Sequence, residues 1–143
     1  MDQTVKELNK FLKGQYMAIH GYEHYMQKEP DPQVRAELQQ IQQEHKMNAM
    51  RVAERIQHLG GTPVTDEGLL GSIQGYLHNL KIPRDTGIIL ENALHGEDYY
   101  GMEVAKDEVA GKLDEESKRL IDSILENQQT HVDRLNALLQ KER

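Results

Sequence analysis

Six polar side chains interrupt the apolar stripes of four predicted helices, and their types and spacing could support chemistry. In chain order they are Gln15, His45, Asn48, Glu97, Gln128 and His131. Each takes the place of an apolar residue about halfway along its helix, so a bundle of the four helices would bring all six into one layer. An unpartnered buried polar group costs about 1–3 kcal/mol, so these side chains must satisfy one another or bind a ligand.

The layer contains two imidazoles and one carboxylate, which are ligands that divalent transition metals accept. We therefore predict that His45, Glu97 and His131 hold one iron, manganese or zinc ion. Water or amide oxygens would complete the site, the amides being Gln15, Asn48 and Gln128.

The same residues also allow a metal-free interpretation. Glu97 can pair with His45 or His131 while the amides bridge the rest, which makes a hydrogen-bonded polar plug that fixes the register of the helices. Glu44, beside His45, is an additional candidate oxygen ligand, although a solvated glutamate is its simpler interpretation. His20 and His24, four residues apart, form a second candidate pair of metal ligands, although such pairs are common on solvated helix faces.

Four long helices must position this layer. Amphipathic spacing predicts helices over residues 4–28, 32–59, 85–110 and 114–141. No segment shows the alternation typical of a strand.

The predicted helix ends have recognisable residues. Thr4 and Glu7 have the spacing of a capping box, and Asp31 and Asp114 are predicted N-caps of the second and fourth helices. Glycines at 60 and 111 are placed to end the second and third helices.

The links within each pair of helices are short, whereas the crossover over residues 60–84 is long. Its pattern is compatible with a short helix after Asp66. This connectivity predicts one all-α domain over 1–143, an antiparallel four-helix bundle of ferritin-like type with the crossover between helices two and three.

Composition excludes several classes of protein. The 143 residues include 17 basic and 24 acidic side chains, which gives a net charge of −7 and argues against a nucleic-acid partner. No cysteine is present, so thiolate metal sites and disulfides are excluded. Without a long apolar segment or a signal peptide, the chain is expected to be cytoplasmic and not membrane-bound, with an acidic surface available to a protein partner.

Three segments resemble bacterioferritin, a member of the ferritin-like superfamily. They are QYMAIHGYEHY in the first predicted helix, EHKMNAMRVAERIQHLGGTP in the second and ILENQQTHVDRL in the fourth. The resemblance extends along nearly the whole chain, and it is most specific at the end of the second helix and in the fourth. The chain is also similar to small bacterial ferritin-like proteins of unassigned activity, some associated with general-stress operons.

The resemblance implies a di-iron site in which most ligands are replaced. Gln15 stands for the first Glu of that family, His45 and Asn48 for the first Glu-x-x-His, and Gln128 for the Glu of the second. Only Glu97 and His131 are kept, and one carboxylate cannot balance two ferrous ions in a buried site. Lys46 matches the haem-binding methionine of that family, so no haem is predicted.

The resemblance therefore implies a protein with a degenerate di-iron site, which binds a transition metal and is linked to iron handling or to oxidative or general stress. If the chain is an enzyme, the reaction would be ferrous oxidation by dioxygen or peroxide. The alternative is a metal-free structural or protein-interaction bundle.

Two further expectations concern assembly and the aromatic residues. No fifth helix follows residue 141, so we expect a homodimer rather than a 24-subunit cage. The tyrosines are predicted to pack between helices or subunits rather than to act as redox relays, namely Tyr16, Tyr22, Tyr25, Tyr99 and Tyr100.

Overall fold

The chain folds into helices joined by short loops and one long crossover. The structure, a computed structural model, describes the backbone of residues 2–109 and 111–143 and the side chains of residues 3–98 and 111–143. Over these residues it contains five helices and no strand: α1 (Asp2–Lys28), α2 (Pro32–His58), α3 (Asp66–Leu80), α4 (Thr86–Val109) and α5 (Glu115–Glu142). The all-α prediction is confirmed. Ala110, the predicted end of the third long helix, lies outside the described residues.

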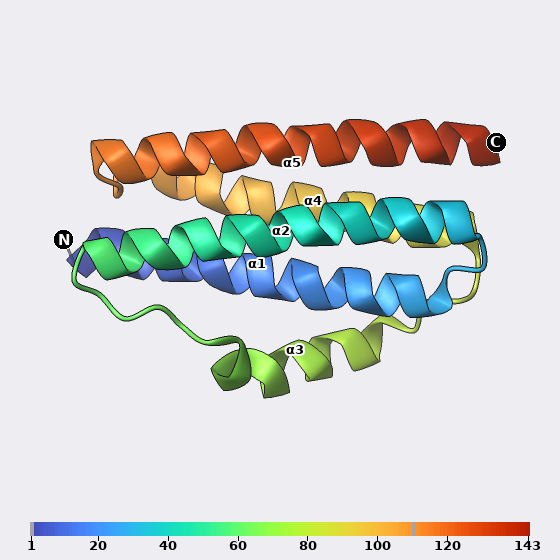
Figure 1. Cartoon of the computed structure of the whole chain (residues 1–143), viewed down its shortest axis with the longest axis horizontal. Coiled ribbons are helices and arrows are strands. Elements are labelled where there is room, and N and C mark those ends of the chain that lie inside the picture. Colours follow the sequence, from blue (N-terminus) through green and yellow to red (C-terminus); the bar gives the residue numbers. More distant parts are fainter. Residues whose placement is uncertain (1, 110) are drawn as a thin grey trace.

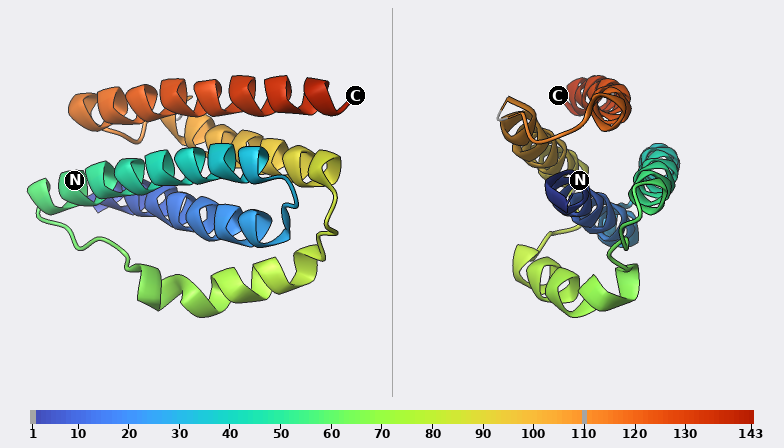
Figure 2. Two further views of the ribbon diagram at one scale, coloured as in Figure 1. Left: turned by 45° about the vertical axis from the view of Figure 1, so that its right-hand side comes forward. Right: turned by 90° about the vertical axis from the view of Figure 1, so that its left-hand side faces the viewer.

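Four of the helices form the bundle, and α3 lies outside it. Viewed along the helices, α1, α2, α4 and α5 occupy the corners of the bundle, while α3 lies beyond α1 (Figure 2). The crossover leaves the end of α2, passes through α3 and returns along the outside of α1 to the start of α4 (Figure 1). Helix α1 packs chiefly against α2 and α4 against α5, as the short links within each pair predict.

Most helix ends form as the sequence indicates. Asp31 caps α2 by accepting a hydrogen bond from the backbone N–H of Gln33, at 2.9 Å. Asp114 caps α5 in the same way, accepting from the N–H of Ser117 at 2.8 Å. Gly60 and Gly111, with φ of +82° and +70°, adopt the left-handed conformation that ends a helix at little cost for glycine.

The predicted capping box at Thr4 is wrong. Helix α1 already includes Asp2, so Thr4 lies inside its first turns rather than at the N-cap. The Thr4 hydroxyl instead donates a hydrogen bond to the carbonyl oxygen of Lys112, at 3.2 Å. A tertiary contact with the loop between α4 and α5 has replaced the local cap, which spacing alone does not reveal.

The long crossover contains the short helix that its pattern allowed. Thr65 caps α3 by accepting from the N–H of Gly68, and Ile73 is its one side chain described as fully buried. His20 Nε2 on α1 lies 2.8 Å from Asp66 Oδ1 at the start of α3. Helix α3 thus packs against α1, and the contact between His20 and Asp66 joins the two helices.

The apolar core is divided into two halves by a polar layer. One half contains Leu38, Ile41 and Leu135, and the other contains Leu12, Val52 and Ile124. Between them lie six side chains that are each at most 4% exposed: Gln15, His45, Asn48, Glu97, Gln128 and His131. Each of the six residues predicted to face inward is therefore buried.

The hydrophobicity of the outer surface bears on membrane insertion and on assembly. Over the described residues, no helix is long and apolar enough to cross a membrane. Met47 and Met50 on α2 are 60% and 65% exposed, which is high for large apolar side chains. The homodimer and the partner of the acidic surface stay predictions.

Removal of the α5 cap should measurably destabilise the bundle. Asp114 holds both the N–H of Ser117 and, at 3.0 Å, the guanidinium of Arg55 on α2. We expect Asp114→Ala to lower the free energy of unfolding by about 1–2 kcal/mol, the usual cost of a lost N-cap. Urea denaturation measures this change. The control is Asp122→Ala, an exposed position within α5; an equal loss in both variants would contradict the capping role.

Candidate metal centre

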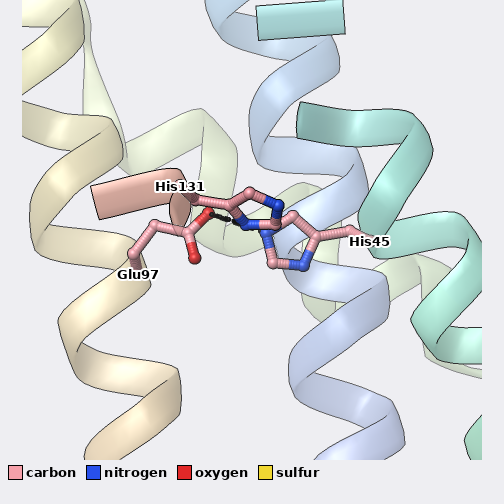
Figure 3. Close-up of side chains that lie close together, drawn as sticks. All are labelled: His45, Glu97 and His131. Carbon is pink, nitrogen blue, oxygen red and sulfur yellow. Dashed lines mark hydrogen bonds and ion pairs between the residues drawn. The ribbon is translucent and has the colours of Figure 1, made fainter. Parts of the chain in front are cut away.

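Three ionisable side chains from three helices converge at the middle of the polar layer. His45 comes from α2, Glu97 from α4 and His131 from α5, and their rings and carboxylate point toward one another (Figure 3). One ligand atom from each lies within 4.8 Å of the other two. All three side chains are buried. The three residues selected from the sequence are therefore brought together.

Glu97 Oε1 is the point where these groups meet. It lies 2.7 Å from His45 Nε2 and 3.4 Å from His131 Nδ1. The hydroxyl of Tyr22, on α1, donates a hydrogen bond to the same oxygen at 2.6 Å. A carboxylate only accepts hydrogen bonds, so each neighbour must offer it a proton or a cation must lie between them.

A chain of amides determines which nitrogen of His45 carries a hydrogen. Gln128 donates its amide N–H to Glu97 Oε2 at 3.4 Å, so its carbonyl oxygen faces the amide of Gln15 at 3.3 Å. The carbonyl oxygen of Gln15 then faces His45 Nδ1 at 2.7 Å. Because that oxygen can only accept, His45 Nδ1 must donate. His45 Nε2 is consequently the nitrogen that faces Glu97.

His131 is oriented by a carboxylate on its other side. His131 Nε2 lies 3.1 Å from Glu44 Oε1 and donates to it, because a carboxylate cannot donate. His131 Nδ1 is buried and, among the described residues, has no hydrogen-bond partner. Although it is 3.4 Å from Glu97 Oε1, the contact lacks hydrogen-bond geometry.

One nitrogen of each imidazole thus lies within 3.4 Å of the same carboxylate oxygen. If both imidazoles are neutral, these two nitrogens carry lone pairs beside the ionised Glu97 in a buried setting, and the contacts are repulsive. Either a proton shared with His45 Nε2 or a metal ion removes this repulsion. Each imidazole also has its second ring N–H held by an oxygen, an arrangement that metal-binding histidines almost always show. The residues present therefore fit one divalent metal ion.

The electrostatics of the centre favour an ionised carboxylate. Burial alone would raise the pKa of Glu97, but the two imidazoles outweigh it and hold that pKa well below its usual range. Burial and the adjacent Glu97 carboxylate raise the pKa of Tyr22 well above 10. Tyr22 is therefore a permanent hydrogen-bond donor to Glu97.

Glu44 is not the solvated glutamate that the sequence suggested. Its side chain is 38% exposed, yet it accepts hydrogen bonds from His131, from Asn127 at 2.6 Å and from Arg134 at 3.0 Å. Burial would raise the pKa of Glu44, but these bonds lower it. Glu44 therefore positions His131 and does not point at Glu97.

Three contributing residues were missed from the sequence. The sequence predicts only a packing role for Tyr22, and Asn127 and Arg134 are not among the candidates that it yields. Helical spacing could have indicated all three, because Tyr22 follows Gln15 by two turns and the other two lie four residues before and three after His131. What spacing does not show is the partner on the neighbouring helix.

The remaining sequence candidates fall outside the centre. Asn48 donates to Asn127 Oδ1 at 2.9 Å instead of contacting the three central residues. His20 is engaged by Asp66. Burial and Lys28 lower the pKa of His24. The side chains of Tyr99 and Tyr100 lie outside the described residues.

The lowered pKa of Glu97 predicts how stability depends on pH. A carboxyl whose pKa is lower in the folded than in the unfolded protein stabilises the fold above its unfolded pKa of about 4.3. That contribution is lost as the pH falls from there towards the folded pKa. We therefore expect the difference in unfolding free energy between wild type and Glu97→Gln to be largest above pH ~5 and to shrink by pH ~3. Urea titrations across this range measure it, and a constant difference would contradict the assignment.

The fold is that of the ferritin-like proteins. It superposes, with a TM-score of 0.79 and 18% sequence identity, on a two-domain protein from Anabaena variabilis that contains DJ-1/ThiJ/PfpI-like and ferritin-like domains. The match covers 98% of this chain and 40% of that one, so the chain spans less than half the length of its structural relative.

Residues 3–107 match the family described as a domain of unknown function, DUF2383, and the chain belongs to that family. A comparison with curated protein sequences gave no match. The ferritin-like fold expected from the sequence is thus confirmed, while the closer likeness to bacterioferritin stays a prediction.

Proposed function

We propose that this protein binds one divalent transition-metal ion through His45, Glu97 and His131. The observation that carries the proposal is the orientation of the two imidazoles. His45 Nδ1 is held by the carbonyl of Gln15, and His131 Nε2 is held by Glu44. Their other nitrogens lie 2.7 and 3.4 Å from Glu97 Oε1. Two histidines and one carboxylate form a ligand set known for zinc and for non-haem ferrous iron.

The proposal includes an evolutionary origin for this metal site, namely descent from a di-iron site like that of bacterioferritin. The six-residue layer lies at the middle of a ferritin-like bundle, and its one central carboxylate suits one ion better than two. Bound iron would supply one-electron chemistry with dioxygen or peroxide. On this basis we propose a role in iron handling or in oxidative or general stress.

A specific observation also favours the metal-free alternative. The 2.7 Å contact between His45 Nε2 and Glu97 Oε1 is the length of a charge-assisted hydrogen bond. With one proton in that contact, the layer becomes the polar plug anticipated from the sequence. In the metal-free function a proton lies between His45 Nε2 and Glu97 Oε1. In the metal-binding function a metal ion takes its place.

Metal titration of the purified chain distinguishes them. Protein stripped with a chelator is mixed separately with Zn²⁺, Mn²⁺ and, without oxygen, Fe²⁺, then desalted and analysed for metal. We expect about one equivalent bound and a higher melting temperature, since a ligand at about 100 times its Kd stabilises a protein by ~2.7 kcal/mol. Calorimetry in buffers of different ionisation enthalpy should show that binding releases a proton.

The matched control is His95→Asn, which removes an exposed imidazole of α4 close to Glu97 in sequence; His131→Asn removes a proposed ligand. The first should bind metal like wild type, while the second should not. If wild type retains less than about a tenth of an equivalent of every ion and its melting temperature does not change, the metal proposal fails and the plug is the function of the layer.

A further inference from the structure

A small cavity adjoins the centre on the side of α1, α3 and α4. Its inner end is formed by Tyr22 and Glu97, and its outer end includes Tyr76 of α3. The inner pair are 2% and 4% exposed, whereas Tyr76 is 43% exposed. The cavity measures about 20 Å³, which is more than the ~10–15 Å³ that a water molecule requires. It therefore links a surface residue of the crossover helix with the buried carboxylate.

The walls of the cavity select against ions. Among the described residues that line it, every one apart from Glu97 is uncharged, and the walls include Ala18, Gly21 and Ala93. A cation would lose its hydration along these walls before it met a counter-charge, and an anion would meet the Glu97 carboxylate. Charged groups lie instead on the α2–α5 side, where Glu44 pairs with Arg134. The cavity suits an uncharged molecule.

Gly21 gives independent evidence that unfilled volume is present at this position. It is buried in the middle of α1, where glycine is about 1 kcal/mol less favourable than alanine. A Cβ atom built on Gly21 would meet, among the described residues, nothing closer than the ring of Tyr25, at 3.9 Å. A methyl group would therefore fit without overlap, and it would fill part of the cavity.

We infer that this cavity admits and binds a small uncharged molecule, of about the size of water or dioxygen, next to Glu97. Helix α3 forms its outer wall through Tyr76, which gives the crossover helix a role at the centre. What the protein does with that molecule rests on the proposed metal-binding function. The cavity itself is open to test in the absence of metal.

Dissolved dioxygen is a suitable probe because it is uncharged and paramagnetic. In metal-free protein with labelled alanine methyls, pressurised dioxygen should speed the NMR relaxation of Ala18 and Ala93 well beyond that of Ala49. The three are matched in burial, at 5%, 1% and 4% exposed, but Ala49 belongs to the other half of the core. Equal enhancement at all three methyls would overturn the inference.

A pair of glycine variants makes the test specific. Gly21→Ala should abolish the extra enhancement at Ala18 and Ala93. Gly71→Ala, in α3, adds the same methyl where nothing lies within 4 Å, and it should leave the enhancement unchanged. Tyr76→Ala should increase it by opening the outer end. Persistence of the enhancement in Gly21→Ala would overturn the inference.

The two proposals fail separately. The relaxation experiment contains no metal, so a negative metal titration leaves its result intact. Conversely, Gly21→Ala should bind metal with the affinity of wild type, because Gly21 contributes no ligand. If metal binds but the two methyls show no extra enhancement, the proposed function stands and the cavity inference falls.

Discussion

Glu97→Ala is expected to abolish metal binding at the polar layer. Among the side chains that the structure describes, Glu97 is the one carboxylate that both central imidazoles face, at 2.7 and 3.4 Å. Loss even of a residue that merely orients a metal ligand weakens binding by about 10–100-fold, so loss of the shared ligand should exceed 100-fold. Metal-free stability should fall by up to about 3–5 kcal/mol, because one partner of a buried pair is removed. Metal analysis and urea denaturation measure the two effects.

The controls separate the centre from general effects of charge. Asp98→Ala removes the exposed neighbouring carboxylate of α4 and should leave both quantities near wild type. Glu44→Ala removes the group that orients His131 and should weaken binding only about 10–100-fold. If Glu97→Ala does not fold, Glu97→Gln keeps the size of the side chain and tests the charge. Unchanged metal occupancy in a folded Glu97 variant would move the site elsewhere, with His20 and His24 next.

The second large effect is expected when carboxylates are restored to the layer. Gln15 and Gln128 contact each other at 3.3 Å, and Gln128 contacts Glu97 at 3.4 Å. In Gln15→Glu/Gln128→Glu, three carboxyl groups would share one buried region, where they cannot all ionise without a compensating charge. We expect the metal-free variant to lose several kcal/mol of stability, on the order of that for an uncompensated buried charge.

Added metal should reverse this loss. Three carboxylates and two imidazoles offset most of the charge of two divalent ions and offer ligands to both, so the stoichiometry should rise from one to two. The melting temperature should increase more on metal addition than in wild type. The control Gln57→Glu/Gln129→Glu makes the same charge change at exposed positions and should change neither quantity. A variant that binds one ion, or that is stable without metal, would contradict the ligand assignments.

The composition of the polar layer was predictable because helical periodicity is a local property. Positions three and four residues apart share one face of a helix, so Glu97 and His131 could be placed on inward faces from spacing alone. The short links then brought the four faces together. The capping box at Thr4 failed because its hydroxyl bonds to Lys112, far away in the sequence, and no local pattern reports such a contact.

The partners within the layer were not predictable in the same way. Whether Glu44 faces solvent or His131 depends on the side-chain conformations of α2 and α5 once they pack. The cavity behind Glu97 depends equally on where the crossover helix rests, because Tyr76 contributes its outer end. Periodicity along one helix contains no information about the distance to the next.

The sequence by itself determined that four amphipathic helices carry six polar residues at one height, and that one carboxylate stands among them. Helix formation and amphipathicity are encoded over a few neighbouring residues. Only the tertiary structure decided that His45 and His131 each turn one nitrogen to an oxygen acceptor and the other to Glu97. That choice is made by hydrogen bonds between helices, whose direction follows from a carboxylate that can accept but not donate.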